Sequence, residues 1–327
     1  MSTVEYVELF ELVSKENFDE QRYLEQNQDV KRAVAEGVIE SARKHCLRHG
    51  LKEKRSQQKR VEDYLEELVR LRKRKLARIK KRLKKGIDVH INDQMVVDYT
   101  GSGRKEKFGF SETDNVSSFF YDDLPLEIIN RNPEGLILDC GAGFRPVYYE
   151  NVVNYEIVPY PTTDVIGFAE DLPFEDNSFD AVFSFAVLEH VKLPFEAAAE
   201  MCRVLKPGGT MAVCTAFLQP VHGYPHHYYN MTHMGLKALF EDEIDIERQF
   251  VNSGTGPVWA LSWILRRWAK QLPARERKKF LKMKVADLID HPFEYLDHGF
   301  VTGLPEEANF ELASATLLVG TKRNQPG

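Results

Sequence analysis

The chain of 327 residues has an ordinary globular composition, with 43% hydrophobic residues, 29% charged residues and a net charge of −6. It contains no stretch of 18 uninterrupted apolar residues, and its acidic start, MSTVEYVELFELV, lacks the basic-then-apolar order of a signal peptide. We therefore expect neither a membrane span nor secretion. The four cysteines form no CxxC pair, which favours reduced thiols in a cytoplasmic protein.

Residues 1–51 predict a module of short helices. Asp19 and Asn27 are suited to begin helices, and Gly37 and Gly50 are suited to end them. The segment that starts FDEQRYLEQNQDV and ends HCLRHGLKEKR resembles a short helical module appended to bacterial surface and polysaccharide-related proteins. This resemblance leaves room for a protein partner at the N-terminal helices.

Residues 52–86 predict a basic helical arm. Residues 52–85 hold 16 Lys and Arg against five Asp and Glu. Apolar residues recur at helical spacing, at Val61, Leu65, Leu68, Leu76, Ile79 and Leu83. Three interpretations remain open: a solvated spacer helix, a helix packed on another domain or in a coiled coil, and a contact with anionic lipid or nucleic acid. Base stacking has little support, because no aromatic residue follows Tyr64 in the arm.

Residues 87–323 alternate between strand-like and helix-like segments. The predicted helix at 194–205 begins at Pro194 and ends before Pro207. Short apolar runs predict strands at 135–140, 152–157, 163–168, 179–185, 210–217, 243–250 and 312–320. This alternation favours an α/β fold with a doubly wound, mostly parallel sheet and an N-terminal helical extension.

The first of these strands ends in the sequence LDCGAG. Glycines directly after a strand allow the backbone to approach a ligand closely, and Gly141 and Gly143 are separated by one residue. A nicotinamide fingerprint would need a third glycine, but that position holds Pro146. An acid, Asp139, stands two residues before the first glycine.

Four motifs in order, over about residues 136–240, resemble class I S-adenosylmethionine-dependent methyltransferases with a type 11-like domain. The motifs are LDCGAG, NYEIV, GFAEDLPFEDNSFDAVFSFAVLEHV and RVLKPGGTMAV. The resemblance implies a Rossmann-like seven-stranded sheet, methyl transfer and S-adenosyl-L-methionine as cofactor. It assigns cofactor binding to Asp139, Gly141, Gly143, Glu156, Ala169, Glu170, Ser184 and Phe185.

Within that set, the glycine N–H groups would approach the methionine part, Glu156 the ribose hydroxyls, and Ala169 and Glu170 the adenine. Phe168 stands where many relatives have aspartate, and it could stack on the base. For Arg145, two interpretations remain open: a pair with the carboxylate of the cofactor, or a side chain that points to solvent.

Candidate general bases lie in PVHGYPHHYYNMTHMGL, directly after the fifth predicted strand, and in LEHV after the fourth. We expect His222 or His226, then His190, to accept a proton, although the loop could be purely structural. No metal is expected, because the spacing H-x3-H-H-x5-H matches no standard zinc pattern and lacks a clear carboxylate. Ser184-Phe185-Ala186-Val187 lacks the Asn/Asp-Pro-Pro-aromatic tetrapeptide of enzymes that methylate base amines or glutamine amides.

These features predict O-methylation of a small molecule or a glycan, because YPHHYYNMT resembles a methyltransferase subgroup found among bacterial glycan and cell-surface genes. A role in polysaccharide biosynthesis follows from that resemblance. Two alternatives are a non-catalytic scaffold that binds the cofactor, and an RNA-modifying enzyme tethered by the basic arm, although nucleic acid is not the favoured partner. The insertion at 257–305 predicts a helical lid, or else a surface for self-association or peripheral membrane contact.

Overall fold

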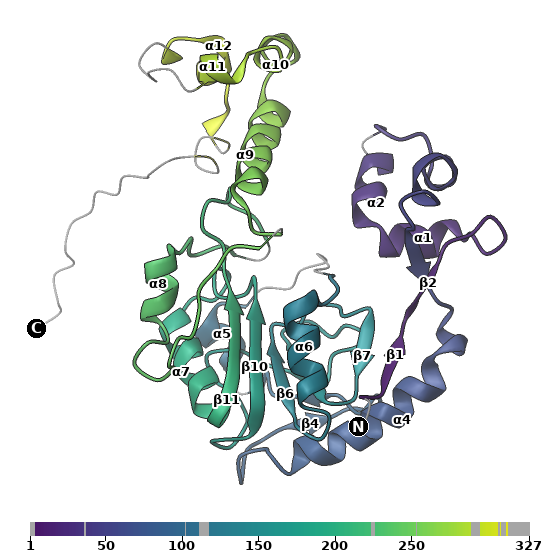
Figure 1. The fold of residues 1–327 in the computed structure, drawn as a ribbon, viewed down its shortest axis with the longest axis vertical. Helices are drawn as coiled ribbons and strands as arrows, with labels where there is room; N and C mark the ends of the chain where they lie inside the picture. The colour runs from purple at the N-terminus through teal and green to yellow at the C-terminus, as the bar shows by residue number, and fades with distance from the viewer. Residues whose placement is uncertain are drawn as a thin grey trace, which may run out of the picture.

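The computed structural model describes residues 4–306, except 36, 102, 111–117, 224–225, 253 and 289–294, together with residues 308 and 312. Its centre is a seven-stranded sheet (Figure 1). In sheet order the strands are β11 (Leu205–Cys214), β10 (Phe179–Phe185), β6 (Ile137–Cys140), β8 (Val152–Glu156), β9 (Val165–Ile166), β5 (Val97–Asp98) and β4 (His90–Ile91). All neighbours are parallel except the edge pair β4 and β5. The predicted Rossmann-like α/β fold class is confirmed.

Burial alternates along the central strands, because successive side chains of a strand point to opposite faces. Ile137 and Val152 pack against α6 on one face, whereas Leu138 and Val153 pack against α4 and α7 on the other. The helices that cover the sheet are therefore α6 (Asp123–Arg131) on one side, and α4 (Leu65–Lys80) and α7 (Pro194–Val204) on the other. Both faces of the sheet are covered, as the apolar runs predicted.

The strand order places a switch point beside β6. From β6 the chain continues to β8 and β9 on one side, and it then returns to β10 and β11 on the other side. Ligands of open parallel sheets bind beyond the carboxyl ends of the strands at such a point. The residues that follow β6 and β10 therefore meet where a ligand is expected.

Five of the predicted strands are present, although β9 is shorter than expected and β11 starts earlier. The predicted strand at 243–250 is wrong: residues 245–250 form no regular structure and are largely exposed. Five acids fall within 241–247 and leave too little apolar surface for the segment to be buried as a strand. The two-residue strands β4 and β5 were missed because so short a pairing leaves no periodic signal. The expected strand at 312–320 lies, apart from its first residue, outside the described residues.

The N-terminal module contains strands as well as the predicted helices. Its helices are α1 (Glu20–Gln26), α2 (Gln28–Ala35) and α3 (Ala42–His45), followed by a π-helical turn at Cys46–Gly50. Asp19 caps α1 by accepting a hydrogen bond from Arg22 N at 3.0 Å. The strand β2 (Phe10–Leu12) pairs with β3 (Ser56–Gln58), so this part of the predicted arm lies with the module. A separate small core forms around Tyr23.

The first strand of the chain pairs with a strand of the large domain. Strand β1 (Tyr6–Glu8) pairs antiparallel with β7 (Val147–Tyr149), which directly follows the glycine loop. These two strands form a sheet of their own, beside the central one. The N-terminal segment is therefore fixed to the domain on both sides of the module, by β1 and by α4.

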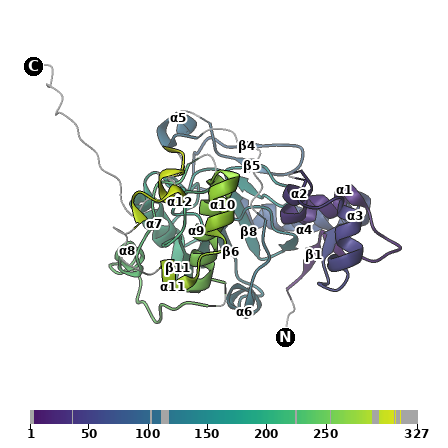
Figure 2. The ribbon, with the colours of Figure 1, turned by 90° about the horizontal axis from the view of Figure 1, so that it is seen from above.

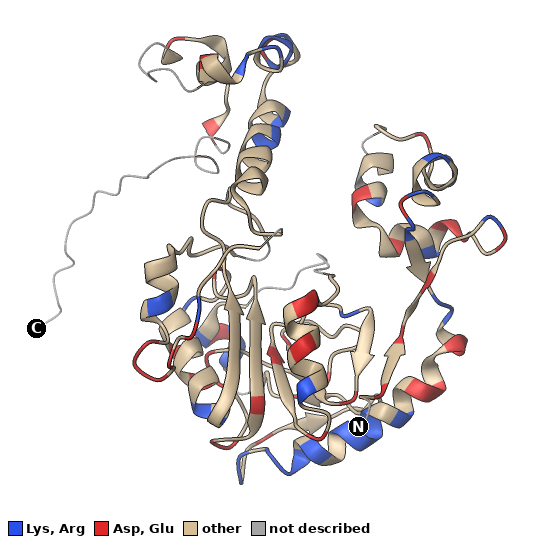
Figure 3. Cartoon of the chain, in the orientation of Figure 1, with Lys and Arg blue, Asp and Glu red and all other residues tan. Residues whose placement is uncertain are grey.

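The basic arm is a packed helix, and its interpretation as a solvated spacer is wrong. A one-turn 3-10 helix at Val61–Asp63 leads into α4, which runs below the sheet (Figures 1 and 3). Leu68 and Leu71 pack against Tyr148, and further along the helix Leu76 and Ile79 enter the main core. Apolar residues on one stripe thus bury a helix that is otherwise strongly charged.

Polar contacts from α4 converge on one buried carboxylate, Asp164. Lys75 is fully buried, and its Nζ donates to Asp164 Oδ2 at 2.8 Å and lies 3.4 Å from the ring centroid of Tyr148. Tyr148 donates its hydroxyl to the same carboxylate, and Asn154 donates its backbone N–H to it at 2.9 Å. Burial lowers the pKa of Lys75 to about 8, although Asp164 opposes that shift. This carboxylate therefore joins α4 to the sheet.

The predicted helical insertion forms a separate unit beyond the carboxyl edge of the sheet (Figures 1 and 2). Its helices are α9 (Pro257–Gln271), α10 (Ala274–Phe280), α11 (Val285–Leu288) and α12 (Gly299–Thr302). Trp268 packs with Phe280 and Phe300 in a small core that includes no residue of the sheet. The remaining short helices are α5 (Arg104–Phe108) and α8 (His233–Ala238). Across the described residues, no helix has the length and apolar character needed to cross a bilayer.

Replacing Asp164 by Asn should lower the free energy of unfolding by about 3–5 kcal/mol, because Lys75 would keep a buried charge without its counter-charge. Chemical denaturation followed by circular dichroism measures this change. The matched control is Glu150→Gln, which removes a partly exposed partner of Arg74 and should cost less than about 1 kcal/mol. Equal effects of the two substitutions would contradict the role given to Asp164.

Candidate active site

The glycine loop after β6 folds back onto the end of β8. Gly141 and Gly143 have φ angles of +84° and +62°, in the left-handed region that favours glycine. The N–H groups of Gly141 and Ala142 both donate to Tyr155 O, at 2.9 and 3.0 Å. A Cβ on Gly141 would also clash with Val187, whose Cγ1 would lie at 2.8 Å. Both the backbone angle and the close approach therefore require glycine at position 141.

Glu156, at the end of β8, holds this loop. Its Oε2 accepts from Gly143 N at 2.7 Å, and its Oε1 accepts from Ile157 N at 2.8 Å. Burial raises the pKa of Glu156, whereas these backbone N–H groups oppose the shift. Each carboxylate oxygen can accept two hydrogen bonds, so the carboxylate keeps capacity for hydroxyl donors. The loop and this acid thus lie side by side, as the sequence predicted.

Asp139 precedes the loop, and one of its two carboxylate oxygens is occupied by protein groups. Its Oδ2 accepts from Arg145 Nε at 2.8 Å and from the hydroxyl of Tyr121 at 2.5 Å. Arg145 is 1% exposed, and its guanidinium lies between the rings of Phe119 and Tyr121, at 3.8 and 4.3 Å from their centroids. The interpretation of Arg145 as a solvent-exposed side chain is wrong, because the side chain is buried and pairs with Asp139. Arg145, directly before the position where the third glycine is missing, thus forms an internal ion pair.

The segment after β9 also turns inward. Ala169 and Glu170 are buried, and burial raises the pKa of Glu170, although the backbone N–H groups of Glu170, Leu193 and Lys192 oppose the shift. Phe168 is 4% exposed and packs against Phe108 and Phe110, with centroids at 5.2 and 6.0 Å. The ring of Phe168 therefore belongs to an aromatic group contributed by the end of α5.

At the end of β10, Ser184 is fully buried, and its hydroxyl lacks a hydrogen-bond partner among the described residues. Phe185 is half-buried and packs on Phe183 with a centroid distance of 5.6 Å. Ala186 follows with φ of +56°, an uncommon angle for a residue with a Cβ, and its N–H donates to Cys214 O at 2.9 Å. This strained turn directs residues 187–190 toward the glycine loop.

His190 and His222 come together beyond this turn, with ring centroids 5.2 Å apart. His190 Nδ1 lies 2.8 Å from the carbonyl oxygen of His226, and His222 Nδ1 lies 2.9 Å from that of Pro220. Because a carbonyl accepts only, each Nδ1 carries the proton and each Nε2 presents a lone pair. Burial lowers the pKa of both imidazoles.

The other two histidines of the loop have different places. His226 is exposed, and its ring reaches Gly109 O at 3.1 Å, away from the pair. His227 lies 4.4 Å from His222 between ring centroids, but both of its nitrogens are committed. Its Nδ1 accepts from His222 N, and its Nε2 donates to Tyr229 O and Asn230 Oδ1. Of the three predicted bases, the structure therefore brings together His190 and His222.

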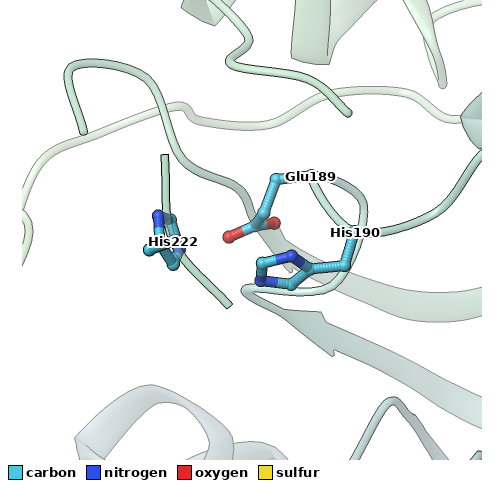
Figure 4. A group of neighbouring side chains, drawn as sticks. All are labelled: Glu189, His190 and His222. Carbon is cyan, nitrogen blue, oxygen red and sulfur yellow. The ribbon is translucent and has the colours of Figure 1, made fainter. Parts of the chain in front are cut away.

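Glu189 joins these two histidines and was not predicted as a site residue (Figure 4). It is 1% exposed, its Oε2 accepts from Thr215 Oγ1 at 2.9 Å, and its Oε1 has no partner in the part of the chain that the structure describes. Burial raises the pKa of Glu189. The signal that could have found it is its place beside His190, just after a central parallel strand.

One aromatic residue of the insertion reaches the site. The ring of Trp263, on α9, lies 4.9 Å from that of His222 between centroids. Helix α9 thus contacts the histidine loop through Trp263, and Trp259 and Leu261 on the same helix are more than half exposed. The predicted insertion therefore meets the site through Trp263 and extends away from it.

Comparison with known proteins agrees with the motifs. Residues 140–213 match a family model described as a methyltransferase domain. The chain is 50% identical over 64 residues to demethylmenaquinone methyltransferase of Renibacterium salmoninarum, over 19% of this chain and 27% of that protein. It is 41% identical over 131 residues to an uncharacterized methyltransferase of Mycobacterium leprae, over 34% of this chain and 48% of that protein. The chain thus spans less than half the length of these curated relatives.

Among solved structures, phosphoethanolamine N-methyltransferase 2 of Haemonchus contortus in complex with S-adenosyl-L-methionine aligns with 55% of this chain and 47% of its own. The TM-score is 0.31 and the identity 20%, which is too low to carry an argument. The family assignment depends on the sequence matches and on the parallel sheet described above. Together they confirm the resemblance to methyltransferases, with residues 140–213 matching the methyltransferase family model.

Proposed function

We propose that the chain is an S-adenosylmethionine-dependent methyltransferase that methylates an oxygen of a small molecule or glycan. One observation carries this proposal: the left-handed loop Gly141–Gly143 lies against Glu156 at the switch point of the sheet. A Cβ on Gly141 would clash with Val187, so only glycine lets the loop pack this closely against the segment that follows β10. The residues present fit a nucleoside cofactor.

In this proposal, the backbone of the loop binds the methionine part of the cofactor. Glu156 accepts hydrogen bonds from the ribose hydroxyls, and residues 168–170 lie around the adenine. Asp139 would act through Arg145 and the loop, because its Oδ2 is occupied by Arg145 and Tyr121 and its Oδ1 is buried without a partner among the described residues. Ser184 and Phe185 end the strand that faces the loop. When bound, S-adenosylmethionine would supply an activated methyl group, and the protein would align it with an acceptor.

The acceptor would meet the loop of His190 and His222. Each of these imidazoles has a lone pair at Nε2 and a fixed Nδ1 proton, which suits an acceptor hydroxyl that must lose its proton. His226 is the weaker candidate of the three predicted bases, because its ring lies outside the pair. The oxygen acceptor also agrees with Ser184-Phe185-Ala186-Val187, which lacks the tetrapeptide of amine methylation.

The structure gives little support to the alternative of an RNA-modifying enzyme tethered by the basic arm. Several arginines of the arm are engaged within the chain: Arg72 with Gln94 O and Pro161 O, Arg74 with Glu150, and Arg78 with Glu134 O. Charges committed in this way contribute less to an electrostatic contact with phosphates. The arm therefore serves the fold, and we assign it no nucleic-acid partner.

Replacing Glu156 by Ala should weaken the affinity for S-adenosylmethionine by roughly 10- to 150-fold, because hydrogen bonds to a charged group contribute about 1.5–3 kcal/mol. Isothermal titration calorimetry measures this change. Glu156→Gln keeps one oxygen for Gly143 and should retain part of the affinity. The control Glu134→Ala, at an exposed acid before β6, should bind as the wild type does. Unchanged affinity in Glu156→Ala would refute the role of this acid.

Replacing Gly141 by Ala tests the backbone cradle. The substitution adds the cost of a left-handed alanine, about 1–2 kcal/mol, and the clash with Val187. The control is Gly86→Ala, where φ is +73° and nothing lies within 4 Å of the added Cβ. Gly86→Ala should reduce the stability of the protein and leave its affinity for S-adenosylmethionine unchanged. Gly141→Ala should reduce both the stability and the affinity measured by calorimetry. Equal affinity in the two variants would argue against close approach at position 141.

A further inference from the structure

We propose that Glu189, His190 and His222 form a binding site for one divalent transition-metal ion, with zinc as the best-fitting ion. One ligand atom from each residue lies within 4.8 Å of the other two. The three side chains point toward one another (Figure 4). This inference does not depend on the proposed methyl transfer, but it replaces the general-base role given above to His190 and His222, because an Nε2 that binds a metal cannot also accept a proton.

The hydrogen bonds of the histidines are those of metal ligands. A histidine that binds a metal commonly donates its other ring N–H to a carbonyl or carboxylate, which fixes the tautomer and the ring orientation. Nδ1 of His190 and Nδ1 of His222 each lie against a backbone carbonyl, at 2.8 and 2.9 Å. Both Nε2 atoms are then left as lone pairs that can be donated to a cation.

Glu189 supplies the negative charge. A carboxylate that is 1% exposed is costly to keep without a counter-charge, and within the described residues its Oε1 has no hydrogen-bond donor. The other oxygen accepts from Thr215 Oγ1, which fixes the orientation of the carboxylate. A bound cation would satisfy Oε1 and explain why an acid is buried beside two imidazoles.

The histidine loop is built to approach His190. Gly223 has φ of +79°, and a Cβ at this position would lie 3.0 Å from both ring nitrogens of His190. The loop therefore brings His222 over His190 only because residue 223 is glycine. The next histidine, His227, is excluded as a fourth ligand, since both of its nitrogens are committed.

The chemistry of the three ligands favours some metal ions over others. Two imidazoles and one carboxylate suit zinc in sites that keep an open position, and they also suit iron(II), whereas magnesium and calcium prefer oxygen ligands. Tetrahedral zinc with bonds of about 2.0–2.1 Å separates its ligand atoms by about 3.3 Å. The three ligand atoms lie within 4.8 Å of one another, so binding would draw them closer together by side-chain rotation. The sequence argued against a metal here because the carboxylate comes from a different segment than the loop.

The position of the site suggests what the ion does. Val187, which abuts Gly141, is only two residues before Glu189. An open coordination position would thus lie on the acceptor side of the glycine loop, where the ion could bind an acceptor oxygen and lower its pKa. The ligand class at this position is an oxygen donor such as a hydroxyl group.

The direct test is metal binding by the full chain without a tag, after treatment with a chelator and dialysis. We expect one zinc ion per chain, measured by elemental analysis and by competition with a chromophoric chelator, and no binding of magnesium. Cobalt(II) should give the intense visible bands of a four-coordinate N/O site without a thiolate band, which excludes the four cysteines as ligands.

Variants locate the ion. Glu189→Gln and His222→Asn should each weaken zinc affinity by at least about 100-fold, because loss of a partner outside the coordination shell already costs 10- to 100-fold. Thr215→Val should weaken it about tenfold. His226→Asn is the matched control, since it removes a nearby exposed imidazole but keeps the carbonyl that holds His190, and it should bind zinc like the wild type.

The proposal is overturned if the wild type binds no zinc or cobalt, or if His226→Asn loses as much affinity as His222→Asn. Unchanged zinc affinity in Glu189→Gln would also overturn it. Circular dichroism of each variant shows whether it is folded, and His222→Asn, in a surface loop, remains informative if the buried Glu189→Gln does not fold. Because no cofactor is added, failure of S-adenosylmethionine binding would leave this result unaffected.

Discussion

The parallel pairing of β6 with both β8 and β10 is the constraint on which the rest of the site depends. β6 is a four-residue strand, and it is paired along its length with Val152–Tyr155 on one side and over Ile137–Asp139 on the other. Because the two neighbours end at the same edge, the glycine loop, the acid of β8 and the strained turn after β10 must meet there. A change in this register would separate all three at once.

Around that edge, the protein buries charges in pairs rather than excluding them. Arg145 with Asp139 fixes the loop from below, and Lys75 with Asp164 fixes the long helix to the strands that carry Glu156. Removing one member of such a pair leaves an uncompensated buried charge, so each member depends on the other. The site is therefore held by polar contacts that lie one layer beneath the ligand surface, where they are shielded from water and salt.

The fold was predictable where apolar and polar side chains alternate along a strand or where apolar side chains recur at helical spacing. The positions of candidate site residues were predictable where a glycine or an acid ends a strand. The five core strands, the loop at Gly141 and the acid Glu156 belong to this class. Arg145 could not be placed, because its partner Asp139 is a neighbour only after the loop has turned. Glu189 was missed for a similar reason: its relation to His222 spans two loops, and its burial depends on the packing of β11. Likewise, the packing of α4 depended on Lys75 finding a carboxylate 89 residues away.

The pairing of β1 with β7 has a consequence for synthesis of the chain. Tyr6 lies opposite Tyr149, so the first strand leaves the ribosome long before its partner exists. At 5–20 residues per second, the interval is roughly 7–30 s. During that time the module around Tyr23 can close through β2 and β3, while the edge of β1 stays unpaired and open to other nascent strands. Strand β1 is thus made well before the strand that pairs with it.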